Sequence, residues 1–313
     1  MTEAPVYPIE LQAVTKQYGR HIAVEELSFC VKPGEIFGFL GQNGAGKTTT
    51  LRMIMDIIAP SAGKVMVMGN DRPRLVRNQV GYLPEERGLY RKMKALDTIA
   101  YFARLKGVPR GVARRRAAQL LDDYGLGAQA KSKIETLSKG MAQKIQVLST
   151  IAHDPDILVF DEPFSGLDPV NQQVLEDLIT TLRDRGKTII FSTHIMEHAE
   201  RLCDRFLMLR KGRKVFEGTL DEARALEPST LILQTPDDPL PLLDVPGVED
   251  IVARDRGRYR LVVREDTDRQ AILRRALDLS IRIESFGEEE FSLHDLFFRL
   301  AAAPTAVSEE PRP

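Results

Sequence analysis

The stretch that decides the fold reads Gly41-Gln42-Asn43-Gly44-Ala45-Gly46-Lys47-Thr48-Thr49. It follows an apolar run at residues 36–40 and precedes an amphipathic run at residues 50–58, the pattern of a buried strand, a turn and a helix. The turn matches the spacing G-x-x-x-x-G-K-S/T, in the strand-to-helix context that a P-loop requires. A glycine-rich turn that binds nothing is the alternative, and the Gly46-Lys47-Thr48 trio after a strand argues against it. The sequence therefore predicts an α/β fold built around a phosphate-binding loop.

Each residue type in this loop suits a polyphosphate ligand. Glycines let the backbone curve around the phosphates with its N–H groups pointing inward. The helix that follows adds unpaired N–H donors and the positive end of its dipole. Lys47 can reach the β- and γ-phosphates of a nucleoside triphosphate, and the Thr48 hydroxyl can ligate Mg²⁺.

The composition narrows the class of protein. The chain has 313 residues, with 44 Lys plus Arg against 45 Asp plus Glu. Because basic residues are not in excess overall, the charge gives no support to nucleic-acid binding. Cys30 and Cys203 form no C-x-x-C pair, and we interpret them as free thiols in a reducing compartment. The N-terminus lacks a signal-peptide pattern, and no apolar run approaches the roughly 18 residues of a membrane span. We expect a cytosolic protein that meets a membrane only through a partner.

Hydrophobic patterns divide the chain into domains. Alternating runs at residues 9–14 and 23–31 predict a small antiparallel β region before the parallel core. Helical patterns at residues 94–105 and 112–124 predict a helical subdomain, at about residues 90–150, inserted into the α/β order. The predicted boundaries are 8–226 for the nucleotide-binding domain, 229–301 for a small accessory domain and 302–313 for a disordered tail.

The accessory domain has a pattern of its own. After a plausible boundary at Glu227-Pro228-Ser229, the predicted elements follow the order β(α)ββαβα, with the last strand at residues 281–285 and the last helix at residues 291–300. This order suggests a small ferredoxin-like α+β domain. The domain adds no recognisable catalytic motif, so we expect it to regulate the protein or to support a dimer.

A basic cluster occupies the second helix of the inserted subdomain, at Arg110, Arg114, Arg115 and Arg116. Such a cluster is either a solvated helix face or a surface for an anionic partner. From the sequence we favour the solvated face.

Three further side chains are expected to meet the phosphate ligand. Asp161 and Glu162 follow the apolar run at residues 157–160, which is typical of a parallel strand buried on both faces. His194 stands at the carboxyl end of another buried strand, at residues 187–192. Because open α/β sheets bind ligands at the carboxyl ends of their strands, we expect these side chains beside the P-loop.

The motifs together indicate a family. A helix opens at Leu137-Ser138-Lys139-Gly140, where Ser138 is a good N-cap and the helix start is a second potential phosphate site. With the P-loop, Asp161-Glu162, the turn at residues 165–168 and His194, it completes five motifs whose order resembles the ATP-binding subunit of ABC transporters over roughly residues 8–226. The accessory domain and the run at residues 81–90 look like a subgroup of bacterial exporters that includes sodium-extrusion and drug-resistance types.

The resemblance implies roles around one ATP molecule. Tyr18 would stack on adenine, and Thr48 and Asp161 would hold Mg²⁺. Glu162 would polarise the attacking water, and His194 would contact the γ-phosphate and fix the water geometry. The residues that would hold the phosphates are Gly41, Gln42, Asn43, Gly44, Ala45, Gly46, Lys47, Thr48 and Thr49.

The resemblance also implies a second subunit. Ser138 and Gly140 would bind the γ-phosphate of that subunit's ATP, and Asp168 would lie at the interface. The chain carries one P-loop and one Ser-x-Gly helix start, so in a head-to-tail dimer each completes the other's site. Closure would also expel water from the two sites.

Two positions depart from the family pattern. Glu85 stands where the family usually has glutamine, in a loop that senses Mg²⁺ and touches the membrane subunit. A carboxylate can still ligate Mg²⁺, but it cannot donate a hydrogen bond as an amide does. In the signature motif, Lys139 and Met141 replace the usual residues, while Ser138 and Gly140 are retained and preserve the expected anion site.

We therefore expect a peripheral ATPase subunit that drives an exporter through a separate polytopic membrane permease, as a homodimer with a second ATP-binding subunit. The rival hypothesis is a soluble ABC-type ATPase acting on nucleic acid in translation or repair. The single cassette, the net charge of −1 and the absence of coiled-coil or zinc-binding insertions argue against it. A third hypothesis, a scaffold ATPase of cluster assembly, ranks last.

Overall fold

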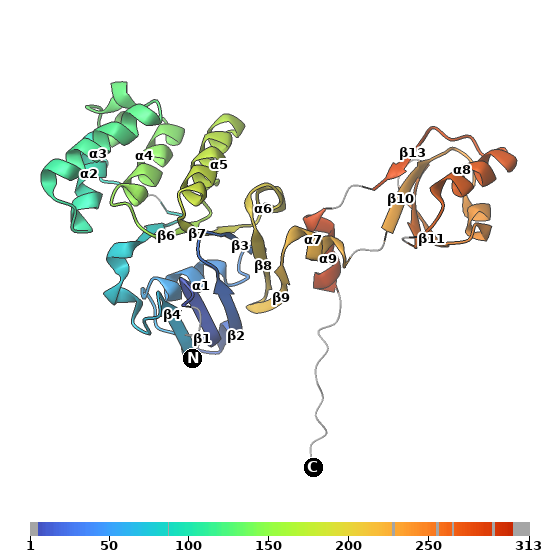
Figure 1. Cartoon of the computed structure of the whole chain (residues 1–313), viewed down its shortest axis with the longest axis horizontal. Coiled ribbons are helices and arrows are strands. Elements are labelled where there is room, and N and C mark those ends of the chain that lie inside the picture. The colour runs from blue at the N-terminus through green and yellow to red at the C-terminus, as the bar shows by residue number, and fades with distance from the viewer. Residues whose placement is uncertain are drawn as a thin grey trace, which may run out of the picture. The chain divides into compact units, whose positions relative to one another are not determined.

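A computed structural model describes residues 6–86, 88–226, 229–254, 257–264, 266–289 and 292–302. The chain forms two compact units, the first ending at Leu220 and the second running from Asp221 to Ala303 (Figure 1). The predicted boundary at Glu227-Pro228 lies outside the described residues, as do Arg87, Phe291 and residues 303–313 of the predicted tail. Ala302 ends the last helix.

A six-stranded sheet forms the centre of the first unit. Its strands lie in the order β5 (Val80–Leu83), β6 (Ile157–Asp161), β7 (Thr188–Thr193), β3 (Ile36–Leu40), β8 (Arg205–Arg210) and β9 (Arg213–Gly218). All neighbours are parallel except β8 and β9. Every residue of β3, β6 and β7 is buried, as their continuous apolar sequences predict for strands covered on both faces.

A separate antiparallel sheet confirms the predicted β region. Its strands lie in the order β2 (His21–Val31), β1 (Ile9–Tyr18) and β4 (Ala62–Val67). Its apolar face shares a hydrophobic core with β3 and with α1 (Lys47–Ile54), the helix that follows the P-loop. This core fixes the direction in which α1 leaves the loop.

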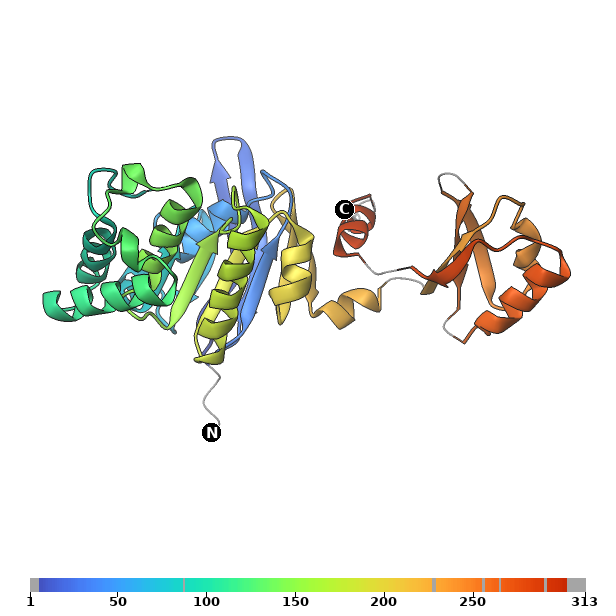
Figure 2. The same ribbon diagram turned by 90° about the horizontal axis from the view of Figure 1, so that it is seen from above.

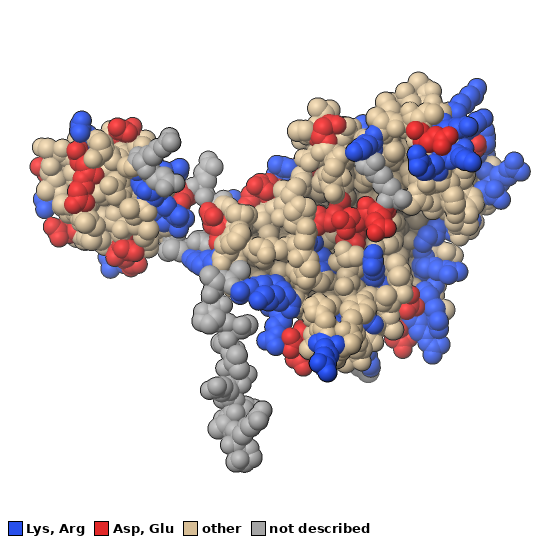
Figure 3. Space-filling view, turned by 180° about the vertical axis from the view of Figure 1, so that it is seen from behind, with Lys and Arg blue, Asp and Glu red and all other residues tan. Residues whose placement is uncertain are grey.

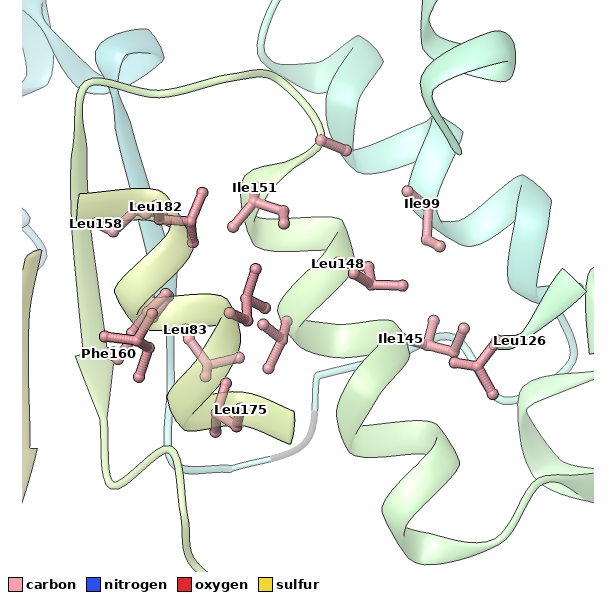
Figure 4. Close-up of a cluster of buried hydrophobic side chains, with 14 of the residues drawn as sticks. Leu83, Ile99, Leu126, Ile145, Leu148, Ile151, Leu158, Phe160, Leu175 and Leu182 are labelled. Atoms are coloured by element: carbon pink, nitrogen blue, oxygen red, sulfur yellow. The ribbon is translucent and has the colours of Figure 1, made fainter. Parts of the chain in front are cut away.

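The helical subdomain comprises α2 (Ala95–Leu105), α3 (Arg110–Asp123) and α4 (Lys139–Ile151) (Figures 1 and 2). Its helix α4 packs against the edge strand β5. Helix α4 joins it to the sheet (Figure 4). Ile145 and Leu148 point toward the other helices, whereas Ile151 points toward β6 and α5 (Pro169–Asp184). One hydrophobic core therefore extends from the sheet into the subdomain.

The remaining elements of the first unit are short. Two 3₁₀ helices, η1 (Pro73–Leu75) and η2 (Arg77–Gln79), precede β5. Two more, η3 (Gly127–Gln129) and η4 (Ile134–Thr136), connect α3 to α4. Helix α6 (Met196–Leu202) follows β7, and α7 (Leu220–Arg224) leads out of the unit.

The second unit has the predicted ferredoxin-like topology. Its elements are β10 (Ser229–Gln234), η5 (Leu240–Asp244), β11 (Val248–Ala253), β12 (Arg258–Val263), α8 (Arg269–Asp278), β13 (Ser285–Glu288) and α9 (Leu293–Ala302). The antiparallel sheet has the order β11-β12-β10-β13, and η5 takes the place of the first helix.

The last strand of this unit was predicted too early, at residues 281–285. The chain reverses at Ser280, whose φ of 58° is left-handed, and the Ile281 N–H donates to Ala276 O to cap α8. Ile281 therefore enters the core as part of a helix cap. Strand pairing begins only at Ser285, opposite Gln234.

We expect Gly81→Ala to destabilise the first unit by about 1–3 kcal/mol, because the added methyl overpacks the core between β5 and α4. A Cβ at Gly81 would lie 2.8 Å from both Thr150 O and a Leu158 methyl group. Urea unfolding followed by fluorescence or circular dichroism measures the change. Gly111→Ala, at the start of α3, is the matched control because its Cβ would meet only Arg115 at 3.7 Å. An equal loss in both variants would contradict the packing argument.

Candidate active site

A cleft at the carboxyl ends of the central strands of the main sheet is lined by most of the predicted site residues. It has a volume of about 820 Å³. Strands β3, β6 and β7 end together at this edge, since Leu40 pairs with Thr193 and Asp161 pairs with Ser192. The lining residues are Tyr18, His21, Ala23, Gln42, Asn43, Gly44, Gly46, Lys47, Thr48, Thr49, Glu85 and Glu162.

The loop between β3 and α1 tolerates no side chain at two of its glycines. Gly46 precedes α1 with a left-handed φ of 106°, and a Cβ there would lie 2.5 Å from Ala23 O. A Cβ at Gly41 would lie 2.6 Å from Leu209 O. The close approach of the neighbouring backbone explains why the P-loop sequence needs glycine at these positions.

Lys47, only 5 % exposed, is held by the same loop. Its ammonium group donates to Gly41 O at 2.6 Å and lies 3.1 Å from Glu162 Oε1. The charge of Lys47 therefore lies in the wall of the cleft, beside the carboxylate of Glu162, the residue that follows β6. The predicted neighbours Gly41 and Ala45 support the loop and do not line the cleft.

The buried carboxylate of Asp161 joins three elements. Its Oδ1 accepts hydrogen bonds from Thr48 Oγ1 at 3.1 Å and from Ser192 Oγ at 2.7 Å. Burial raises the pKa of Asp161, the two hydroxyl hydrogen bonds oppose this rise, and the charge of Glu162 adds to it. Its second oxygen, Oδ2, is buried without a hydrogen-bond partner in the described part of the chain.

An unpaired buried carboxylate oxygen next to a threonine hydroxyl fits Mg²⁺. This ion prefers oxygen ligands and is usually held by one or two protein groups together with phosphates. Thr48 and Asp161, which are hydrogen-bonded to each other, supply oxygen atoms that could hold such an ion, and Glu85 lines the same cleft.

Glu162 is aimed into the cleft by an unusual backbone conformation. Its φ is 48°, a left-handed value that costs a non-glycine residue about 1–3 kcal/mol. The Glu162 N–H donates to Ser192 Oγ at 2.9 Å, and Glu162 Oε2 lies 2.9 Å from His194 Nδ1. Since a carboxylate only accepts, His194 Nδ1 carries the hydrogen of this bond.

The sequence analysis missed Ser192. Its hydroxyl donates to Asp161 and accepts from the Glu162 backbone, so one buried side chain orients both acidic residues. The only signal in the sequence was a hydroxyl residue at the end of a buried strand, two positions before His194.

Comparisons with known proteins show the family of this chain. The family model for "ABC transporter" matches residues 24–165, and that for "ATP-binding protein DrrA1-3-like, C-terminal domain" matches residues 218–301. The ABC transporter ATP-binding protein YhaQ of Bacillus subtilis is 38 % identical, over 94 % of this chain and 99 % of its own. The chain belongs to the family of ABC transporter ATP-binding proteins.

Other relatives share the first unit. The Nod factor export ATP-binding protein I of Burkholderia pseudomallei is 41 % identical over 68 % of this chain and 71 % of its own. A solved structure titled as the ATP-binding subunit of an ABC transporter is 32 % identical, has a TM-score of 0.65 and covers 70 % of this chain and 92 % of that chain. The CbiO1 structure from Clostridium perfringens, 22 % identical with a TM-score of 0.63, shares the fold.

As an ABC transporter ATP-binding protein, the chain binds and hydrolyses ATP for transport. Among its described helices, none combines the length and the apolar character that crossing a bilayer requires.

Three further predicted residues of this ATP-binding protein, Ser138, Gly140 and Asp168, lie at the starts of two helices and do not line the cleft. Ser138 caps α4 by accepting from the Met141 N–H at 3.2 Å, and Asp168 caps α5 by accepting from the Asn171 N–H at 3.0 Å. A Cβ at Gly140 would lie 2.9 Å from Asn171 Nδ2, so the starts of α4 and α5 are in close contact.

We expect Ser192→Ala to slow Mg²⁺-dependent ATP hydrolysis about tenfold at neutral pH, because the buried carboxylate of Asp161 loses the hydrogen bond that the serine hydroxyl donates. The hydrogen bond from Ser192 lowers the pKa of Asp161, so its loss raises that pKa. Mg²⁺ needs the ionised carboxylate, and the acidic limb of the pH–rate profile should therefore move to higher pH.

The control is Ser149→Ala, which removes a buried hydroxyl that donates to Ile145 O within α4. An unshifted acidic limb in Ser192→Ala would contradict this role of the hydroxyl.

Proposed function

We propose that this chain is the Mg²⁺-dependent ATPase of an exporter and works as a homodimer attached to a separate polytopic membrane permease, on the cytoplasmic face of the membrane. The observation that carries the proposal is the constellation of Lys47, Asp161, Glu162 and His194 beside the P-loop. Export is supported by the similarity to Nod factor export proteins and by the exporter-like run at residues 81–90.

The residues of the cleft divide the binding of ATP among them. Tyr18, at the cleft wall, is suited to stacking on adenine, and the P-loop backbone from Gly41 to Thr49 is suited to the phosphates. Thr48, Asp161 and the wall residue Glu85 would hold Mg²⁺, which would neutralise part of the negative charge of the phosphates.

Hydrolysis transfers the γ-phosphoryl group to water. Lys47, now 3.1 Å from Glu162, would turn to the γ-phosphate and leave the carboxylate available to a water molecule. Glu162 accepts a hydrogen bond from that water and orients its oxygen toward the γ-phosphorus. The bond from phosphorus to the water oxygen forms as the bond from phosphorus to the bridging oxygen breaks, ADP leaves with the bridging oxygen, and the proton lost by the water ends on the inorganic phosphate. His194 holds the Glu162 carboxylate from its other oxygen and can contact the γ-phosphate. Positioning and charge do most of this work.

The second subunit is expected to complete each site. Ser138 and Gly140 do not line the chain's own cleft, and the start of α4 offers N–H groups and a positive dipole end to an anion. In a head-to-tail dimer, these groups would meet the γ-phosphate bound by the other copy, with Asp168 at the interface.

We expect Glu162→Gln to reduce ATP hydrolysis at least a hundredfold and to leave ATP binding intact, because the amide retains the size of the side chain but polarises water poorly. Size-exclusion chromatography with ATP and Mg²⁺ should then show a trapped dimer. Glu197→Gln makes the same change at an exposed position on α6 and serves as the control. Normal hydrolysis by Glu162→Gln would refute the assigned role, and a persistent monomer would refute the dimer.

A groove beside the cleft is suited to the membrane permease. It has a volume of about 590 Å³ and a mostly apolar lining: Tyr82, Pro84, Gly88, Leu89, Phe102, Leu105, Lys106, Gln146, Ser149, Thr150 and His153. Its wall at Pro84 continues directly into Glu85, which lines the nucleotide cleft. A permease segment seated here would therefore sense nucleotide through one short loop.

Leu105→Asp should abolish copurification with the permease, because it places a charge in the apolar groove, while ATP binding stays unchanged. The control, Leu277→Asp on α8, makes the same change at a similarly exposed leucine (68 % against 60 %). Pull-down from detergent-solubilised membranes that express both subunits measures the effect. Retention of the permease by Leu105→Asp would show that this groove is not its docking site.

A further inference from the structure

One segment of this chain has a strong local excess of positive charge. Residues 72–116 contain 13 Lys or Arg and 3 Asp or Glu, although the whole chain has a net charge of −1. Figure 3 shows basic side chains gathered along the side of the first unit that carries the helical subdomain. Collected like charges repel one another, so their accumulation calls for a partner that neutralises them.

Five exposed arginines form what we name the basic face: Arg72, Arg74 and Arg77 around η1 and η2, Arg104 near the end of α2, and Arg116 on α3. In the described part of the chain, no carboxylate forms an ion pair with any of the five. Arg114 differs, because Asp97 pairs with it at 3.1 Å.

Contacts made by Lys106 bring these segments together. Its ammonium group donates to Arg77 O at 2.5 Å and to Val80 O at 2.9 Å, which ties the end of α2 to η2. Burial, followed by the charge of Arg77, lowers the pKa of Lys106. Burial and the charges of Lys106 and Arg116 lower the pKa of His153 to about 4, so α3 contributes to the same positive region.

An apolar side chain lies among these cations. Leu75, between Arg74 and Arg77, is 69 % exposed. Leucine gains nothing from a nucleic-acid backbone, whereas at a bilayer surface it enters the boundary between headgroups and acyl chains. Arginine is suited to lipid phosphates at the same depth.

We propose that the basic face binds the surface of a bilayer rich in anionic phospholipid and so orients the subunit beside its permease. The inference rests on the proposed function, because only a membrane-attached subunit brings this face near lipid. The groove that we propose for the permease includes Lys106, whose ammonium group binds the Arg77 carbonyl of the basic face, and Leu105 beside it. The contact with the permease and the contact with lipid are therefore made from the same side of the first unit.

Vesicle cosedimentation of the full chain, purified without a permease, tests the proposal. The chain should bind vesicles of equal parts phosphatidylglycerol and phosphatidylcholine, bind pure phosphatidylcholine weakly, and release as NaCl rises. Arg72→Gln, Arg74→Gln and Arg77→Gln combined should weaken binding about a hundredfold, from about fivefold per cation. Leu75→Ser should weaken it about tenfold.

The control combines Arg185→Gln, Lys211→Gln and Arg258→Gln, which removes the same charge at exposed positions outside residues 72–116. Equal weakening by the two triple variants, or no preference for phosphatidylglycerol, would overturn the proposal. So would stronger binding to a DNA or RNA oligonucleotide that the basic-face variant loses. If the unmodified chain failed to bind the vesicles but still copurified with the permease, this inference alone would be refuted. If the unmodified chain failed to copurify with the permease, the proposed function would be refuted.

Discussion

The site depends on one buried carboxylate shared between two hydroxyl groups. Asp161 at the end of β6 accepts from Thr48 at the start of α1 and from Ser192 at the end of β7. Three segments that are distant in sequence are thereby held at one point, and the same serine fixes the left-handed turn at Glu162. Burying such a charge is costly unless its oxygens are paired, so the second oxygen, which has no partner among the described residues, is suited to a cation.

Much of this could be predicted from the sequence, because each motif is local. The P-loop, the apolar strand before Asp161 and the N-cap at Ser138 are short patterns whose meaning does not depend on distant residues. Ser192 could not be assigned, because its role arises only when β6 and β7 pair with Asp161 opposite Ser192. The strand at residues 281–285 was misplaced because Ile281 completes a helix cap, and its apolar character resembles that of a strand.

The nucleotide cleft and the neighbouring groove of the first unit are lined by adjacent residues of one short loop. The nucleotide cleft includes Glu85, and the neighbouring groove includes Pro84, Gly88 and Leu89. Gln146 of α4 donates to the carbonyls of Pro84 and Glu86, which ties this connecting loop to the helix that begins at the signature motif. A movement of the loop is therefore shared with the start of α4, where the second subunit's phosphate is proposed to bind.

The position of β3 has a consequence for synthesis. This strand carries the P-loop, yet both of its partners come late in the chain: Ile36 pairs with Ile189, and Phe37 pairs with Arg205. At ribosomal rates of about 5–20 residues per second, β3 waits roughly ten to thirty seconds for its neighbours. During that interval its fully apolar sequence has no sheet to enter. The nascent chain therefore exposes an aggregation-prone apolar run until β7 and β8 emerge, and ATP can stabilise the fold only after that point.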